Sequence, residues 1–131
     1  MSFKEYDEYD AMGLAELVKK KEVSAEELLD EAIQRTEKVN GQTNAVVLKH
    51  YDEAKAMIEK GLPEGPFTGV PYLLKDLHVL LTGTKTTYGS KFFKDYVADH
   101  NSTLVDRYLE AGLVIFGKTN SPEFGLTVTT E

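Results

Sequence analysis

The stretch that decides the fold lies near the middle of the chain and reads Phe67-Thr68-Gly69-Val70-Pro71-Tyr72-Leu73-Leu74-Lys75-Asp76. Its glycine and its apolar run predict a buried β-strand that ends at a lysine. Lysine is almost never fully buried unless it is paired or has a function. Burial removes the hydration of the ammonium group and favours the neutral amine, which accepts protons. Lys75 is therefore the candidate general base of this chain.

A second interpretation of Lys75 stays open on these residues alone. A lysine at the end of a strand can extend into solvent, or it can pair with a neighbouring carboxylate such as that of Asp76. Neither arrangement involves catalysis.

The sequence before this stretch predicts mainly helices. Asp10 can cap a helix that runs to about Lys21, and Ser24 and Glu27 have the spacing of a capping box. The helix that they open is expected to stop near Asn40-Gly41. A short strand is predicted at residues 45–48, and a third helix follows it and closes at Gly61.

After the central stretch, strands alternate with a loop and a helix. Residues 77–81 indicate another strand, 82–90 a polar loop with glycines, 102–112 a helix, and 113–116 a strand covered on both faces. Strands that alternate with helices predict an α/β fold with a mixed, mostly parallel sheet. We expect one unit, in which residues 1–62 form a mainly helical lead-in and 63–131 a part of the α/β core.

Composition excludes several classes of function. The 131 residues carry 22 acidic and 15 basic side chains, and this net charge of −7 argues against binding to nucleic acid. There is no cysteine, and no apolar run approaches the roughly 20 residues of a membrane span. The acidic N-terminus lacks the hydrophobic core of a signal peptide, so a cytoplasmic location is expected. His50, His78 and His100 are not at metal-ligand spacing, and we expect neither a metal nor a cofactor.

One pattern match points to a nucleotide. Residues 112–119 read Gly-Leu-Val-Ile-Phe-Gly-Lys-Thr and satisfy the Gly-x-x-x-x-Gly-Lys-Thr pattern of a phosphate-binding loop. In such a loop the residues between the glycines are loop backbone, and their amides face the phosphates. Here these residues are the apolar strand itself, so the context is inverted. Nucleotide binding is kept only as an alternative.

Several short sequence motifs, which occur in a fixed order, give the chain a resemblance to a known family that covers nearly its whole length. They lie at residues 69–76 (Gly-Val-Pro-Tyr-Leu-Leu-Lys-Asp), 83–90 (Gly-Thr-Lys-Thr-Thr-Tyr-Gly-Ser), 102–105 (Ser-Thr-Leu-Val) and 111–125 (Ala-Gly-Leu-Val-Ile-Phe-Gly-Lys-Thr-Asn-Ser-Pro-Glu-Phe-Gly). The chain resembles the N-terminal part of the amidase signature family. Residues 87–90 and 125–131 favour its broad or cyclic-amide hydrolases over its tRNA-dependent amidotransferase branch, the glutamyl-tRNA amidotransferases.

The resemblance implies a hydrolase that cleaves carboxamide C–N bonds with a serine nucleophile, a second serine with a cis peptide bond, and a lysine. It places the catalytic lysine at Lys75, with Asp76 as an orienting neighbour. It also places a loop that contains Thr86, Thr87, Gly89 and Ser90 near the active centre. A small-molecule amide is the implied substrate.

The family's two serines belong to a Gly-Gly-Ser-Ser-Gly-Gly-type segment beyond Glu131. The serines of this chain stand singly at positions 2, 24, 90, 102 and 121. We therefore expect the chain alone to be inactive, to leave Lys75 solvated, and to self-associate through strand edges and apolar faces that lack their cover. The alternative is a non-catalytic product, either a truncated chain or one half of a split enzyme.

Overall fold

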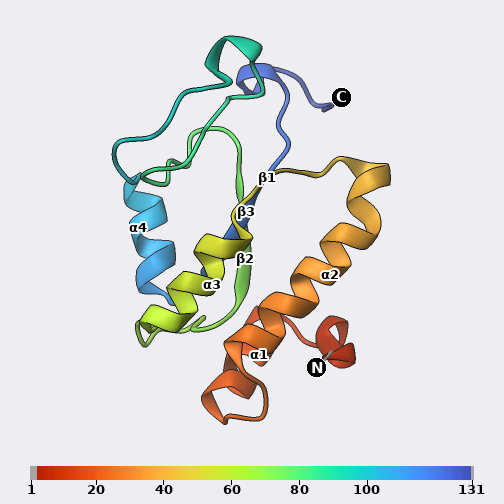
Figure 1. The fold of residues 1–131 in the computed structure, drawn as a ribbon, viewed down its shortest axis with the longest axis vertical. Coiled ribbons are helices and arrows are strands. Elements are labelled where there is room, and N and C mark those ends of the chain that lie inside the picture. Colours follow the sequence, from red (N-terminus) through yellow and green to blue (C-terminus); the bar gives the residue numbers. More distant parts are fainter. Residues whose placement is uncertain (1–2, 131) are drawn as a thin grey trace.

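The computed structural model describes residues 3–130. The start of the acidic N-terminus and Glu131, the last residue of the resemblance, lie outside the described residues. Figure 1 shows the elements in chain order: η1 (Lys4–Glu8), α1 (Ala11–Lys19), α2 (Ala25–Thr43), β1 (Val46–Lys49), α3 (Tyr51–Lys60), β2 (Pro71–Lys75), η2 (Lys91–Phe93), α4 (Thr103–Glu110), β3 (Val114–Thr119) and η3 (Glu123–Gly125). None of the helices between residues 3 and 130 has both the length and the apolar composition that crossing a bilayer requires.

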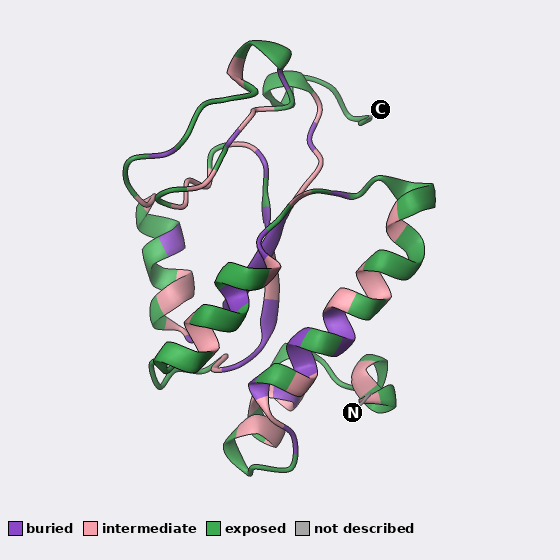
Figure 2. Cartoon of the chain, in the orientation of Figure 1, coloured by how far each residue is buried: buried purple, intermediate pink, exposed green. Residues whose placement is uncertain are grey.

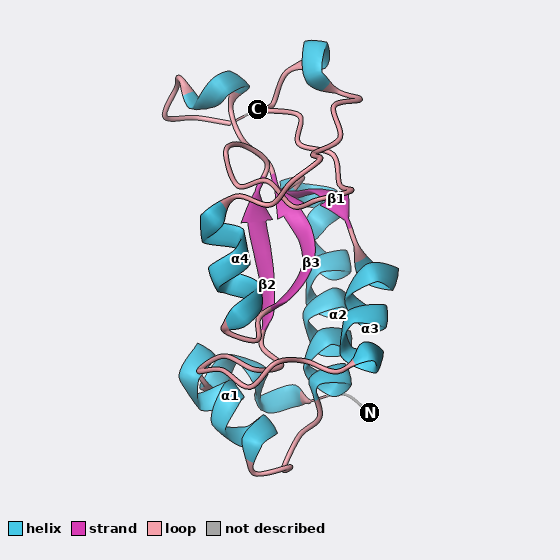
Figure 3. Cartoon of the chain, turned by 90° about the vertical axis from the view of Figure 1, so that its left-hand side faces the viewer, coloured by secondary structure: helices cyan, strands magenta, loops and turns pink. Residues whose placement is uncertain are grey.

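A three-stranded sheet with the order β1-β3-β2 forms the centre of the fold. Strand β3 pairs with β2 in parallel and with β1 antiparallel. The sheet is therefore mixed, and the predicted α/β class is confirmed. Figure 3 shows α4 on one side of β2 and β3, with α2 and α3 on the other side.

Both faces of β3 are buried, as its apolar run predicts. On one face Val114 and Phe116 pack with Leu29 and Ala32 of α2 and with Ala54 of α3. On the other face, Ile115 and Leu74 of β2 pack with Val105 of α4. Figure 2 shows the buried residues along the strands and on the facing sides of α2 and α3.

The helix that leads into β1 begins and ends for local reasons. The Ser24 hydroxyl accepts a hydrogen bond from the Glu27 amide at 3.1 Å, and the Glu27 carboxylate accepts one from the Ser24 amide at 2.9 Å, which confirms the capping box. The predicted stop near Asn40-Gly41 is early, because α2 continues to Thr43. The Asn40 side chain instead holds β1: its amide donates to the Val46 carbonyl at 2.9 Å and its carbonyl accepts from the Val46 amide at 2.8 Å.

The strand predicted at residues 77–81 is wrong. This segment is irregular, because a serine pairs with its backbone groups in place of a neighbouring strand. The Leu80 amide donates to the Ser102 hydroxyl at 2.8 Å, and the Leu80 carbonyl accepts from the Ser102 amide at 3.0 Å. The Ser102 hydroxyl also donates to the His78 carbonyl at 3.1 Å.

The segment before β2 packs closely against the turn that joins α4 to β3. The Phe67 amide donates to the Ala111 carbonyl at 2.9 Å, and the Gly69 amide donates to the Gly112 carbonyl at 2.9 Å. Gly65 allows this approach, because a β-carbon at that position would lie 2.4 Å from the Ala111 carbonyl oxygen. This contact fixes where β2 starts relative to β3.

We expect Gly65→Ala to lower the free energy of unfolding by about 2–4 kcal/mol, since the added methyl group meets backbone and cannot be avoided by a side-chain rotation. Urea denaturation followed by circular dichroism measures this loss. Gly41→Ala is the matched control: a β-carbon there meets nothing within 4 Å, and Gly41 lies inside α2. The control is expected to raise stability by about 0.5–1 kcal/mol. Equal stability of the two variants would contradict this account of the contact.

Candidate active site

The candidate active site lies beyond the carboxyl ends of β2 and β3. In the parallel register Leu74 lies beside Lys118 and Lys75 beside Thr119. The Asp76 amide extends this pairing by donating to the Thr119 carbonyl at 3.0 Å. Open α/β sheets bind their ligands outside this edge, because loops meet there and their polar groups converge.

Lys75, the predicted base, is exposed at the end of β2. The expectation that the strand buries this lysine is wrong, and the alternation of the strand explains why. Leu74 and Asp76 are only 1% and 2% exposed, so the residue between them faces the opposite way. The solvated position expected of Lys75 in this chain alone is the one observed.

Asp76 is buried and holds Thr87. Its carboxylate accepts a hydrogen bond from the Thr87 amide at 2.7 Å and a second one from the Thr87 hydroxyl. The carboxylate therefore orients the loop at residues 82–90, whereas its predicted role was to orient Lys75. This correction follows from the same alternation, which directs neighbouring side chains to opposite faces.

Lys118 is the buried lysine of the described chain, with 0% of its surface exposed. Its ammonium group donates to the Lys85 carbonyl and, at 2.9 Å, to the Thr86 hydroxyl. Burial lowers the pKa of Lys118 to about 8, and the negative charge of Asp76 opposes part of this shift. The ammonium group thus lies at the base of the loop at residues 82–90.

The phosphate-loop alternative does not agree with this geometry. Residues 114–119 form strand β3, so their amides pair within the sheet. A β-carbon at Gly117 would lie 2.6 Å from the Leu48 carbonyl oxygen, so this glycine serves the approach of β1. The lysine of the pattern is enclosed and bound to Thr86.

The other loop residues expected near the active centre come together against residues 121–123. The Ser90 hydroxyl donates to the Glu123 carboxylate at 2.7 Å. Gly89 has a φ of 65°, and a β-carbon there would lie 2.4 Å from the Ser121 carbonyl oxygen. Thr86, Thr87, Gly89 and Ser90 are therefore all placed by contacts with the ends of the two strands or with the segment that follows β3.

The histidines lie apart from one another. His50 is buried at the start of α3, His78 contacts the Tyr88 ring, and exposed His100 pairs with Asp99 at 2.7 Å. Burial lowers the pKa of His50, and the charge of Lys118 adds to this effect. Within residues 3–130 no cluster of three or more His, Cys, Asp or Glu side chains has a geometry that would hold a metal ion.

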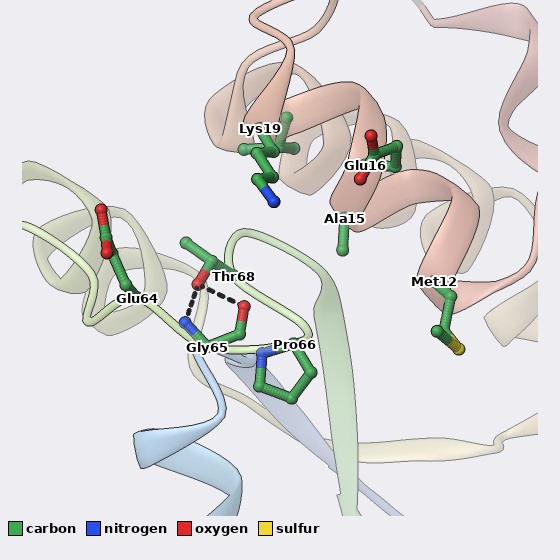
Figure 4. A pocket seen from close by; sticks show the side chains of 9 residues that line it. Met12, Ala15, Glu16, Lys19, Glu64, Gly65, Pro66 and Thr68 are labelled. Atoms are coloured by element: carbon green, nitrogen blue, oxygen red, sulfur yellow. Dashed lines mark hydrogen bonds between the residues drawn. The ribbon is translucent and has the colours of Figure 1, made fainter.

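A hollow lies elsewhere, between α1 and the segment before β2. It has a volume of about 530 Å³, and its lining includes Met12, Ala15, Lys19, Pro66 and Thr68 (Figure 4). Its floor precedes the amino end of β2, whereas Lys75 and Lys118 lie at the carboxyl ends of their strands. The two lysines and the buried carboxylate of Asp76 are at the strand ends, so we place the candidate site there.

Comparison with known proteins agrees with this topology. Residues 27–131 match the Amidase family. The chain is 46% identical over 124 residues to the 6-aminohexanoate-cyclic-dimer hydrolase of Paenarthrobacter ureafaciens, a match that covers 93% of this chain and 25% of that protein. A solved structure of 6-aminohexanoate cyclic dimer hydrolase superimposes with a TM-score of 0.87 at 45% identity, over 94% of this chain and 26% of the other. The glutamyl-tRNA(Gln) amidotransferase of Thermoanaerobacter pseudethanolicus is 35% identical in its A component, over 90% of this chain and 25% of that protein.

The arrangement is that of a mixed α/β amidase core. The chain belongs to the Amidase family, which confirms the resemblance inferred from its sequence motifs. The greater similarity to the cyclic-dimer hydrolase than to the amidotransferase agrees with the expectation from residues 87–90 and 125–131. The chain spans about a quarter of the length of the relatives it matches.

The sequence alone did not lead us to identify Lys118 as a residue of this site. The signal was present, because an apolar run leads to Lys118 just as one leads to Lys75. The rule that a lysine at the end of an apolar strand is buried applies to Lys118, since β3 is central and covered on both faces, whereas β2 lies at the edge of this sheet.

The pKa of Lys118 predicts a rise in stability with pH. Between the folded value of about 8 and the ordinary value of 10.5, the unfolded chain binds more protons at this lysine than the folded chain does. The free energy of unfolding should therefore rise by about 1–2 kcal/mol between pH 8 and pH 9.5. Above pH 10 the rise is opposed by Tyr72, because hydrogen bonding with Tyr108 and burial raise its pKa to about 12. Urea denaturation at half-unit pH steps measures the slope.

The control for this slope is a pair of variants. Lys118→Met should remove the slope, and Lys75→Met, which deletes an exposed lysine at the same edge, should keep it. A rise of equal size in the Lys118→Met variant would show that another group titrates.

Proposed function

We propose that this chain is the N-terminal part of an amidase-type hydrolase that cleaves carboxamide C–N bonds, with Lys75 as the proton acceptor. The observation that supports it most is the 46% identity to a cyclic-dimer hydrolase along nearly the whole chain. We further propose that the substrate is a small molecule with an amide bond, and that cyclic amides are included. This choice rests on the activity in that relative's name.

The proposed chemistry divides the work between groups in this chain and groups outside it. The neutral amine of Lys75 accepts a proton that is relayed through the bridging serine, the one with the cis peptide bond, while the nucleophilic serine attacks the amide carbonyl. Backbone amides stabilise the oxyanion, and the leaving amine departs as it takes back the proton held by Lys75 through the bridging serine; water then attacks the acyl-serine and releases the acid. The single serines of residues 1–131 do not form the pair that this relay requires. The 131-residue chain alone is therefore proposed to be inactive.

The geometry supports Lys75 over Lys118 for the role of base. Lys75 is exposed at the carboxyl edge of the sheet, where a substrate and serines carried by another segment would reach its amine. Lys118 is enclosed, and its ammonium group is occupied by the Lys85 carbonyl and the Thr86 hydroxyl. A proton acceptor has to lie within hydrogen-bond reach of the group that it serves.

The test is a chimera in which this chain replaces the aligned quarter of the Paenarthrobacter ureafaciens hydrolase. We expect the chimera to hydrolyse a cyclic amide, and Lys75→Ala to lower kcat by about 10²–10⁴-fold because the base is lost. Amine release, measured with and without the substitution, gives this ratio. Lys60→Ala, an exposed lysine in the last turn of α3, is the matched control and should keep the activity.

Two results would contradict the proposal. Turnover by the 131-residue chain alone, abolished by Lys75→Ala, would refute the proposed inactivity. An active chimera that is indifferent to Lys75→Ala would refute the role of Lys75.

We also propose that the isolated chain self-associates through apolar side chains near the candidate site. Phe92 and Leu126 are 86% and 82% exposed, and Val128 is fully exposed. Exposed apolar side chains of this size favour burial against another surface.

Sedimentation velocity over a range of concentrations tests this association. The double substitution Phe92→Ser and Leu126→Ser should shift the distribution toward monomer, because it removes apolar surface from the contact. Met12→Ser, which changes an exposed apolar residue on α1, serves as the control and should leave the association unchanged. A wild-type chain that stays monomeric at every concentration would disprove the proposal.

A further inference from the structure

Residues 82–98, which we call the lobe, form a hairpin-like excursion from the carboxyl ends of the strands (Figures 1 and 3). Its two arms are joined by backbone hydrogen bonds: Gly83 to Ala98 at 2.8 Å, Ala98 to Thr84 at 3.0 Å, and Thr86 to Tyr96 at 3.1 Å. An isolated antiparallel bridge between Lys85 and Val97 also lies within the lobe, and neither arm belongs to the three-stranded sheet. Its position therefore depends on the contacts at its base and on those of Tyr88 and Ser90 with residues 123–124.

Two consecutive threonines at the base of the lobe are held by two buried charged groups, one from each parallel strand. Thr86 accepts a hydrogen bond from the ammonium group of Lys118, at the end of β3. Thr87 donates from both its amide and its hydroxyl to the carboxylate of Asp76, which follows β2. Thr86, Asp76 and Lys118 are each at most 2% exposed.

The chemistry of a buried ammonium group explains why this arrangement is specific. A charge taken out of water has to be matched by acceptors at fixed positions, since an unmatched buried charge is strongly unfavourable. The Lys85 carbonyl and the Thr86 hydroxyl are those acceptors. The folded state therefore favours one position of the lobe, the one in which both acceptors contact the Lys118 ammonium.

We propose that Lys118 is a positioning residue of the candidate active site, which fixes the Thr86-Thr87 turn over the carboxyl ends of β2 and β3. This inference rests on the proposed function for the meaning of the site. The lobe then forms one wall of that site, and Lys118 acts on the reaction only through Thr86 and the Lys85 backbone. Lys75 and Lys118 thus have separate tasks: the first transfers a proton, and the second holds the wall.

Hydrogen exchange in the 131-residue chain tests the inference without requiring any activity. Lys118→Met removes the donor and keeps the length of the side chain, and Thr86→Val removes the acceptor and keeps the shape. Each is expected to speed the exchange of the Thr86, Thr87 and Ala98 amides by about tenfold or more, while the amides inside α2 keep their protection. The double variant should exchange no faster than Lys118→Met alone, since that substitution already removes the bond to Thr86.

Two matched variants separate positioning from general destabilisation. Lys75→Met deletes an exposed lysine at the same edge and should leave the exchange of the lobe unchanged. Thr86→Ser restores the hydroxyl and should keep the lobe protected. A slowly exchanging ammonium signal of Lys118 in ¹H–¹⁵N spectra should persist in Thr86→Ser and should move or broaden in Thr86→Val.

Three results would overturn the proposal: a protected lobe in a folded Lys118→Met or Thr86→Val variant, equal loss of protection in Lys75→Met, or additive effects in the double variant. If Lys118→Met fails to fold, Thr86→Val with its serine control decides the question alone. Failure of the chimera to hydrolyse an amide leaves these measurements untouched, so the two proposals fail separately.

Discussion

Strand β3 is the constraint on which the rest of this structure depends. It is paired on both edges, with β1 and with β2, and it is covered on both faces by helices. A strand in this position has no access to water, so its backbone groups must pair within the sheet and its side chains must be apolar or individually matched. Gly117 lets the Leu48 carbonyl approach, so that the backbone of β3 pairs within the sheet. Lys118 is fully buried, so its charged side chain has to be matched by individual hydrogen-bond partners.

The two lysines at the carboxyl edge show how position, and not residue type, sets chemistry. Lys75 ends a strand that is paired on one side, and the alternation directs its side chain outward. Lys118 ends the central strand and is enclosed, so that burial lowers its pKa to about 8. A low pKa alone would favour Lys118 as the base, but its ammonium group donates both of its hydrogen bonds to the lobe, and no substrate reaches an enclosed amine. Geometry therefore has to precede pKa in the assignment of a base.

The sequence predicted those features that arise from local or periodic causes. The capping box at Ser24 and Glu27, the glycine that closes α3, and the two-sided burial of residues 113–116 each follow from patterns within a few residues. The burial of Lys118 and the irregular backbone at residues 77–81 were not predicted, because they depend on partners distant in sequence. Ser102, which pairs with Leu80, is 22 positions away, and Thr86, which contacts Lys118, is 32 positions away.

The phosphate-loop pattern at residues 112–119 shows that a sequence motif alone can also suggest a function that the fold does not support. A phosphate-binding loop and residues 112–119 have the same pattern of glycines, lysine and threonine, yet their backbone amides bind different partners. A phosphate loop presents backbone amides to an anion, whereas here these amides are consumed by β1 and β2. The apolar character of the four intervening residues separates the two cases, because residues that are driven into a core cannot also surround a hydrated anion.

The exposed state of Lys75 has a consequence for how the proposed enzyme would become active. A proton acceptor of this type needs a dry environment, of which the lobe would form one wall. The lobe and the segment after β3 also carry Phe92 and Leu126, whose apolar surfaces are open to solvent. These two exposed apolar residues and the solvated lysine therefore lie at the same end of the molecule, as Figures 1 and 3 show for the lobe and the strand ends. A segment that covered the first would also exclude water from the second, so that folding of the complete site and activation of its base would be a single event.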